Sequence, residues 1–182
     1  MNYKIDEGNV RFPDIKKMNE NVTRIYFDQA QEEREDMEGK SVTIYTAKFV
    51  DSLDQPASAL EGIKAIATAE IVEFDSSSAI NEFFLNGVSM WLDNATRDKL
   101  AKRLDVDAKS GLSVTKVFYE GVAYTLPIQA VEGMLLQLEQ YARDCFDKTS
   151  EHISAIQALN DVDAVANYDY TKGYPTKLEF NI

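Results

Sequence analysis

The chain has 182 residues, and its 19 Lys and Arg residues against 31 Asp and Glu residues give a formal net charge of −12. This length suits one compact domain, or one domain with a small appendage. The acidic balance argues against binding to nucleic acid or to an anionic membrane, because both depend on positive charge that neutralises phosphate. With a single cysteine and a single histidine, the chain can form neither an internal disulfide nor a His-rich metal site.

The N-terminal residues 1–14 lack the apolar core that a signal peptide needs. No stretch approaches the roughly 18 apolar residues typical of a membrane span. We therefore expect a protein that stays in the cytoplasm, or that is carried inside a particle assembled there, and we expect no membrane partner.

The first quarter of the chain combines a polar segment with two β-rich runs. Residues 1–21 have little periodicity and are expected to form a loosely attached arm. The runs VTRIYF, residues 22–27, and SVTIYTAKFV, residues 41–50, alternate as strands do. A charged connector that ends in Gly39 is expected between them. The alternative is a helix over residues 14–27, whose apolar positions also fit helical spacing: Ile15, Met18, Val22 and Ile25.

The middle of the chain predicts a helix, a tight hairpin and a second helix. Residues 57–72 are rich in Ala and Ile, with Leu60, Ile63 and Ala67 on one helical face. Asn86-Gly87 lies between apolar flanks and supplies the two positive φ angles of a type I′ turn. The helix expected over residues 95–107 can be capped by Asp93 or Asn94, and Gly111 follows its end.

A second hairpin is expected over residues 112–128, turning near Glu120-Gly121, and Pro127 suits the first turn of the helix that follows. That helix carries the clearest pattern in the chain, and it can either run unbroken for about thirty residues or break near residues 148–150. Asn160 can cap a short helix after it, and residues 177–182 predict a last strand. The apolar stripe of the long helix consists of Val131, Met134, Leu138, Tyr141, Cys145, Thr149, His152, Ile156 and Leu159.

These elements predict an α+β protein, with short antiparallel strands and hairpins packed on helices and one dominant long C-terminal helix. We expect two regions, residues 1–74 and residues 75–182. Thirty helical residues would span about 45 Å, more than a domain of this size covers comfortably. Cys, Thr and His are also poor residues for a coiled-coil seam. We therefore expect the helix to break or bend near residues 148–150, and the protein to be a monomer or weak dimer.

Neither a nucleophile–base pair nor a pair of acids can be recognised in the sequence. Cys145 and His152 are seven residues apart, which on one helix places them about 10 Å apart along the axis, beyond the ~3 Å that such a pair requires. We interpret both as core residues. No acidic residues show a recognisable glycosidase pattern or the spacing of a calcium loop, and a solvated surface is expected for Glu132, Glu139, Asp161, Asp163, Glu32, Glu33, Glu35, Asp36 and Glu38.

The chain has no GxxxxGK[ST], GxGxxG or GxSxG motif. We therefore assign no catalytic, cofactor-binding or metal-ligating residue, and expect no cofactor. One basic cluster, Arg97, Lys99, Lys102 and Arg103, is interpreted as balancing the acids beside it, with contact to an acidic partner as the alternative. Tyrosines near the C-terminus are interpreted as packing a turn onto a helix, with a sugar-stacking platform as the alternative. The candidate interaction surface is Arg97, Lys102, Arg103, Tyr168, Tyr170 and Tyr174.

Several strings in the C-terminal half carry a family resemblance. They are MWLDNATRDKLAKRL (residues 90–104), YTLP (residues 124–127) and, within residues 134–175, LEQYARDCF, AIQAL, NDVDAV, YDYT and GYP. Through these strings, residues 75–182 resemble the uncharacterised domain of phage and prophage tail-region proteins, in the version found in Bacteroidetes prophages. Its motifs are structural, so the resemblance implies no catalytic residue, and it does not cover the first seventy residues.

The resemblance implies a non-enzymatic structural or tail-associated protein of a phage or prophage, whose partners are other phage structural proteins. One alternative is an assembly chaperone for a tail or fibre component, which leaves before maturation. Another alternative is a hydrolase that depends on carboxylates, and a deep cleft with two converging acids would favour it.

Overall fold

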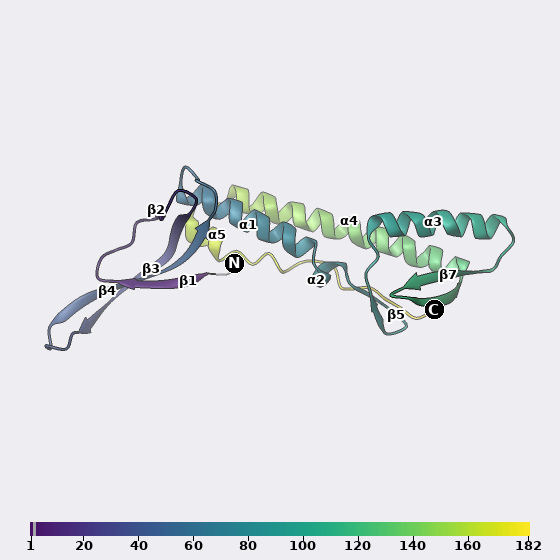
Figure 1. Ribbon diagram of the computed structural model, residues 1–182, viewed down its shortest axis with the longest axis horizontal. Helices are drawn as coiled ribbons and strands as arrows, with labels where there is room; N and C mark the ends of the chain where they lie inside the picture. The colour runs from purple at the N-terminus through teal and green to yellow at the C-terminus, as the bar shows by residue number, and fades with distance from the viewer. Residues whose placement is uncertain (2) are drawn as a thin grey trace. The chain divides into compact units, whose positions relative to one another are not determined.

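The computed structural model describes residue 1 and residues 3–182, and it has the α+β architecture that the sequence predicts (Figure 1). The chain divides into two compact units. Unit 1 consists of residues 1–72 and 151–170, and unit 2 of residues 73–150 and 171–182. The units are therefore not the consecutive regions expected from the sequence, because residues 151–170 belong with the N-terminal strands.

Unit 1 contains a four-stranded antiparallel sheet in the order β1-β4-β3-β2. The expected strand pair is confirmed as β3 (Thr23–Glu35) and β4 (Ser41–Ser52). The loosely attached arm and the alternative helix over residues 14–27 are both wrong, since this segment contributes β1 (Lys4–Gly8) and β2 (Ile15–Lys17). These strands form because β3 and β4 offer edges to pair with, a cause that their own polar sequences do not reveal.

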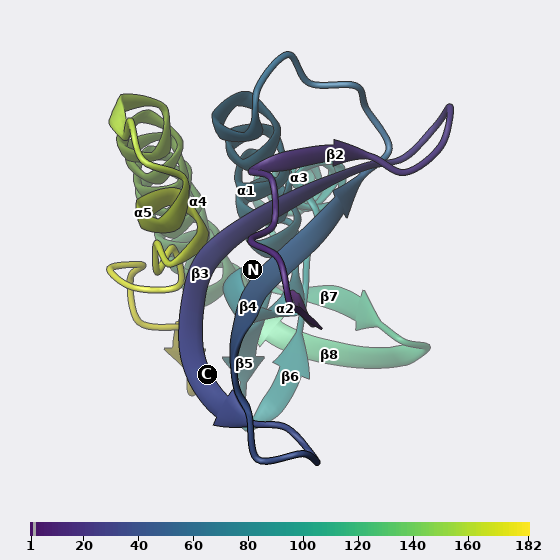
Figure 2. The same cartoon turned by 90° about the vertical axis from the view of Figure 1, so that its left-hand side faces the viewer.

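The sequence predicted a charged connector after residue 27. Instead, β3 and β4 continue together as a curved, two-stranded ribbon, which pairs from Ala30 opposite Thr46 to Glu35 opposite Ser41 (Figure 2). The pairing is interrupted by an irregularity between Phe27 and Ala30, where Asp28 has a φ of 51°. It then resumes as far as Glu35 opposite Ser41. Charged side chains are accommodated here because every residue from 31 to 40 is exposed to solvent.

The core of unit 1 lies among the sheet, α1 (Ala59–Asp75), the end of the long helix and α5 (Val162–Ala166). The expected helix at residues 57–72 is thus confirmed. Asp161, rather than Asn160, caps α5, because its carboxylate accepts the Ala164 N–H at 2.8 Å. The largest side chains that are fully buried in this core are Ile25, Ile63, Ile71, Ile156 and Val165.

Unit 2 contains α2 (Ser78–Asn81) and two hairpins. The first, β5 (Phe83–Leu85) and β6 (Val88–Met90), turns at Asn86-Gly87 with φ angles of 50° and 78°, as predicted. The second, β7 (Val114–Tyr119) and β8 (Val122–Pro127), turns at Glu120-Gly121, also as predicted. The last strand is reduced to β9 (Glu179–Phe180), which pairs parallel with β5.

Two helices complete unit 2, and α3 (Asn94–Lys109) follows the prediction closely. It is capped by Asp93, whose carboxylate accepts the Thr96 N–H at 2.6 Å. The second helix, α4 (Ile128–Ala158), begins directly after Pro127, which is the last residue of β8. Among the described residues, no helix is long and apolar enough to cross a membrane.

The expected break in the long helix is wrong, because α4 is continuous over 31 residues. The length argument assumed that one core must cover the whole helix. Instead, Val131, Met134 and Leu138 pack in the core of unit 2, whereas Ile156 packs in the core of unit 1. Two cores each cover part of the apolar stripe, so the helix has no need to fold back.

Candidate functional site

Two of the three basic residues expected to form an interaction surface, Arg97 and Arg103, contact acidic residues within unit 2. Arg97 forms an ion pair with Glu139 at 2.6 Å and donates to the Leu92 carbonyl at 2.7 Å. Arg103 lies 3.6 Å from the Asp107 carboxylate, and Lys102 is exposed on the same helix. Arg97 therefore contributes to the attachment of α3, and the other two cations remain at the surface.

The three tyrosines are half-buried and hydrogen-bonded to helices. The Tyr168 hydroxyl lies 2.8 Å from Nδ1 of His152, and the Tyr174 hydroxyl lies 2.9 Å from Oγ1 of Thr149. The Tyr170 hydroxyl donates to Glu70 at 3.4 Å. This agrees with tyrosines that pack a turn onto a helix. Tyr168 and Tyr170 belong to unit 1, whereas Tyr174 and the basic residues belong to unit 2.

Cys145 and His152 are buried, as their positions on the apolar stripe predict, with exposed fractions of 3% and 5%. Burial raises the pKa of the Cys145 thiol to about 11. A thiol with this pKa is almost wholly protonated at neutral pH, and the thiolate is the reactive form. Cys145 therefore lacks the activation of a catalytic nucleophile.

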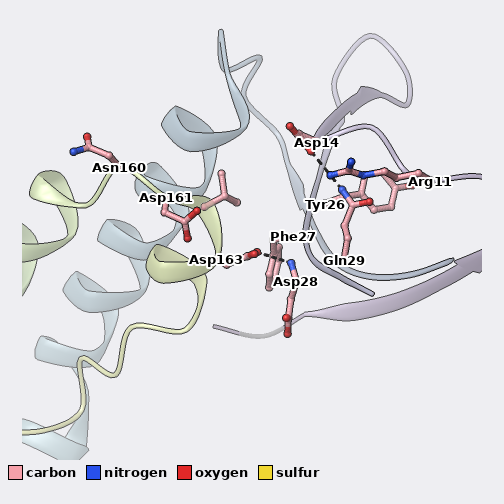
Figure 3. Close-up of a pocket in the computed structure, with 10 residues that line it drawn as sticks. Arg11, Asp14, Tyr26, Phe27, Asp28, Gln29, Asn160, Asp161 and Asp163 are labelled. Carbon is pink, nitrogen blue, oxygen red and sulfur yellow. Dashed lines mark hydrogen bonds between the residues drawn. The ribbon is translucent and has the colours of Figure 1, made fainter. Parts of the chain in front are cut away.

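A pocket in unit 1 is the most polar candidate site (Figure 3). Its cavity has a volume of about 300 Å³. Three segments meet there: the loop before β2, the irregular part of β3 around Asp28, and the N-terminal end of α5. The side chains that line it are Arg11, Asp14, Tyr26, Phe27, Asp28, Gln29, Asn160, Asp161, Val162 and Asp163.

Three of the four carboxylates in this pocket already form structural hydrogen bonds or an ion pair within unit 1. Asp163 accepts the backbone N–H of Asp28, as the dashed line in Figure 3 marks. The Asp28 carboxylate itself forms an ion pair with Lys48, and Asp161 caps α5. Asp28, Asp161 and Asp163 thus each have a structural role in unit 1.

Gln29 has a buried side-chain acceptor in this pocket that lacks a hydrogen-bond donor among the described residues. Its side-chain Nε2 lies 3.4 Å from Oδ1 of Asp14, a long contact. Its Oε1 atom is buried and has no hydrogen-bond partner among the described residues. A buried acceptor without a donor is unfavourable. The pocket is therefore suited to a ligand that donates hydrogen bonds, and its acidic lining favours a cationic one.

A second, shallower hollow extends this pocket along the ribbon. It has a volume of about 190 Å³ and shares Arg11 and Gln29 with the first. Ala30, Gln31 and Tyr45 form the rest of its lining. We call the two together the ribbon groove. It runs from the start of α5 onto the exposed part of β3, which is the shape expected for an extended ligand.

Unit 2 has a cavity of its own, of about 400 Å³, lined by residues of α4 that include Tyr141 and Cys145. The Tyr141 hydroxyl donates to the Ile80 carbonyl at 2.9 Å, and burial raises the pKa of this phenol above its usual range. With the phenol and the thiol both protonated, the cavity offers no base at neutral pH from these two groups.

The part of the chain that the structure describes contains no group of three or more His, Cys, Asp or Glu side chains that could hold a metal ion. No protein-family model, curated protein or solved structure matches this chain.

The sequence analysis missed the residues of the ribbon groove. Arg11 and Asp14 lie in the segment expected to be an arm, and Gln29 in the expected connector. One signal was present. Tyr26 and Phe27 are consecutive apolar residues that interrupt the alternation of β3 directly before Asp28, a pattern typical of a bulge. Bulges often redirect side chains next to functional sites.

Proposed function

We propose that this chain is a non-enzymatic structural protein of a phage or prophage, most closely associated with the tail, which acts through protein–protein contacts. The setting is supported by the sequence motifs of residues 90–104 and 134–175, which resemble those of tail-region proteins. The mode of action is supported by the ribbon of unit 1.

The open edges of this ribbon are the observation that carries the proposal. On one side, β1 pairs with β4 only as far as Gly8 opposite Tyr45. On the other side, β2 pairs with β3 only as far as Ile15 opposite Ile25. Among the described strands, the rest of the ribbon therefore pairs only within itself. Unpaired strand edges offer N–H and C=O groups to another chain, and proteins use them for strand addition.

The groups that could carry a reaction support a binding role over catalysis. Three of the four carboxylates at the unit 1 pocket are engaged in structural contacts, and the thiol of unit 2 is held protonated. The hydrolase alternative needs two acids free to exchange protons with a substrate. It would be favoured again if purified protein hydrolysed a substrate and lost that activity on Asp14→Asn.

Mass spectrometry of purified particles tests the proposal. We expect the chain at a defined copy number per particle. Replacement of residues 32–44 by Asn-Gly joins Gln31 to Tyr45 through a type I′ turn and removes the exposed ribbon. This variant should fold and yet be absent from particles. If the intact chain is absent from particles but their assembly requires it, the chaperone alternative is correct. If it is neither present nor required, the proposal is wrong.

A further inference from the structure

We propose that the free edge of β3, residues 30–35, binds an extended, lysine- or arginine-rich segment of a partner protein, which adds as a strand to the sheet. This inference rests on the proposed function and specifies the partner. We call these residues the β3 edge. Three independent features support it, namely the end of β2, the distribution of charge and the buried acceptor of Gln29.

Beyond Asp28, whose backbone N–H donates to Asp163, no described strand of the chain pairs with the outer side of β3. The backbone of β2 follows β3 up to Asp14, whose carbonyl accepts the Tyr26 N–H at 3.0 Å. The preceding residue is Pro13, which has no N–H and cannot continue the ladder as a donor. A partner strand can therefore add to β3 after Asp28, next to the ribbon groove, where β2 no longer continues.

The charge around the edge selects a basic partner. Residues 32–40 include five acidic and two basic side chains, all exposed. The pocket at the start of the edge adds four carboxylates and one guanidinium, that of Arg11. Cationic side chains on every second residue of an added strand would lie on the same face as Glu33 and Glu35, at cross-strand distance, where opposite charges stabilise pairing.

Gln29 gives the edge a specific anchor. Its Oε1 atom is buried without a donor, although Asp14 lies close to its Nε2. A lysine ammonium or an arginine guanidinium that enters the pocket would approach the Asp14 carboxylate, and would receive this oxygen as an acceptor once the Gln29 amide turns toward it. Binding would thus satisfy an acceptor that the free protein leaves unmet.

A second copy of the chain is a poor occupant of the same edge. Strand pairing between copies would place Glu32, Glu33 and Glu35 close to the same acids of the other copy. Like charges directly opposite are destabilising in a sheet. The net charge of −12 adds general repulsion between copies. A foreign basic segment is therefore the occupant that we infer.

A labelled ten-residue peptide of alternating Lys and Thr, titrated onto the full chain by fluorescence anisotropy, tests the proposal. We expect binding, and hydrogen exchange should show new protection of β3 amides within residues 30–35. A peptide of alternating Glu and Thr should not bind. A Lys–Thr peptide that is N-methylated at every second residue keeps its charge but loses the donors for one edge. It should bind at least about tenfold more weakly.

Matched variants separate the edge from general attraction to an acidic protein. Glu33→Lys with Glu35→Lys, which reverses both charges on one face of the β3 edge, should weaken binding by about tenfold. Asp98→Lys with Glu132→Lys makes the same change in net charge on exposed residues of unit 2, and should change affinity by less than about twofold. Gln29→Leu should also weaken binding about tenfold without lowering the melting temperature, because it removes an unmet acceptor.

Three results would overturn the inference: equal binding of the N-methylated peptide, equal effects of the two charge-reversal pairs, or a stable dimer in light scattering that protects the β3 edge without peptide. Its failure can be distinguished from failure of the proposed function. If the chain is found in particles but the peptide does not bind, only the edge assignment is wrong. If the peptide binds but the chain has no role in particles, the phage setting is wrong and the edge assignment stands.

Discussion

The hairpins of unit 1 and unit 2 differ in strand length, in their turns and in how far the core supports them. In unit 2, each hairpin has short strands and a two-residue turn, Asn86-Gly87 or Glu120-Gly121, and each strand pair is backed by the core. In unit 1, β3 and β4 continue past the core into a ribbon with solvent on all sides of residues 31–40. Turn chemistry determines the first kind of hairpin, whereas long-range pairing determines the second.

The hairpins also differ in whether their residues are buried in a core or exposed for contact with other molecules. The inner face of β7 and β8 buries Thr115, Val117 and Leu126, so its residues are committed to stability. The ribbon buries little beyond the irregularity at Asp28, and much of its length adds nothing to the core of unit 1. A segment that contributes little to stability and is still retained as regular structure is a candidate for contact with other molecules.

The largest expected effect tests whether the two cores are separate. Ile156 and Met134 are both fully buried on α4, one in each core. Either change to Ala should cost about 2–5 kcal/mol, by lost transfer energy and cavity formation. Native-state hydrogen exchange should show that Ile156→Ala lowers protection in unit 1 first, and Met134→Ala in unit 2 first. Equal loss across both units would show a single cooperative structure.

A pair of helical glycines provides the next test. A Cβ atom at Gly62 in α1 would lie 2.4 Å from Cδ1 of Ile25 and 2.7 Å from Cγ of Pro56. Gly62→Ala should therefore destabilise by about 1–3 kcal/mol, although alanine favours helix. At Gly133 in α4 nothing lies within 4 Å, so Gly133→Ala should stabilise by about 0.5–1 kcal/mol. Urea melts of both variants would be decisive, and the same sign for both would contradict this packing.

The turn glycines compare the two kinds of hairpin directly. Gly87 and Gly39 have nearly equal φ angles, 78° and 76°. Gly87→Val should cost at least about 1 kcal/mol, because a β-branched residue is forced to positive φ in a hairpin that belongs to a core. Gly39→Val should cost clearly less in thermal melts, since the end of the ribbon can rearrange in solvent. An unchanged melt for Gly87→Val would contradict the turn assignment.

The smallest effect concerns pH and an ion pair near the base of the ribbon. The Arg24 guanidinium donates two hydrogen bonds to Asp51, at 2.8 and 3.1 Å, and these lower the pKa of the Asp51 carboxyl. Asp51→Asn should cost about 0.5–1 kcal/mol at pH 7. The folded-state pKa is depressed, so this stability is present above the ordinary pKa of about 4 and is lost as pH falls through the lowered value.

Chemical denaturation at several pH values checks this expectation. The gap between wild type and Asp51→Asn should close in acid, whereas Asp98→Asn, at an exposed position of α3, should show no gap at any pH. A gap that persists in acid would mean that Asp51 stabilises through hydrogen bonds of its neutral form.

The fold was predictable where the responsible signal is local. The type I′ turn at Asn86-Gly87, the cap at Asp93 and the apolar stripe of α4 all lie within a few residues of the structure that they specify. Prediction failed where pairing is distant, since β1 contacts β4 some forty residues later. It also failed for the continuity of α4, because the sequence pattern does not reveal that two cores share one helix.

The ribbon groove was less predictable than the fold. Arg11, Gln29 and Asp161 come from three separate parts of the chain, and none has a spacing that indicates a site. The interpretation of Cys145 and His152 as core residues is confirmed, because helical periodicity places both on the buried side of α4. Sequence reasoning could thus reject a site built from neighbouring residues, but could not assemble one from distant residues.

The order in which the units are completed has a consequence for synthesis on the ribosome. Unit 1 needs residues 151–170, and unit 2 needs residues 171–182. At ordinary elongation rates, the strands of unit 1 would wait on the order of ten seconds for the rest of their core. During this interval β3 and β4 are exposed to other nascent chains. The acidic side chains of residues 32–38 would act as gatekeepers over that time, since repulsion between ribbons opposes aggregation.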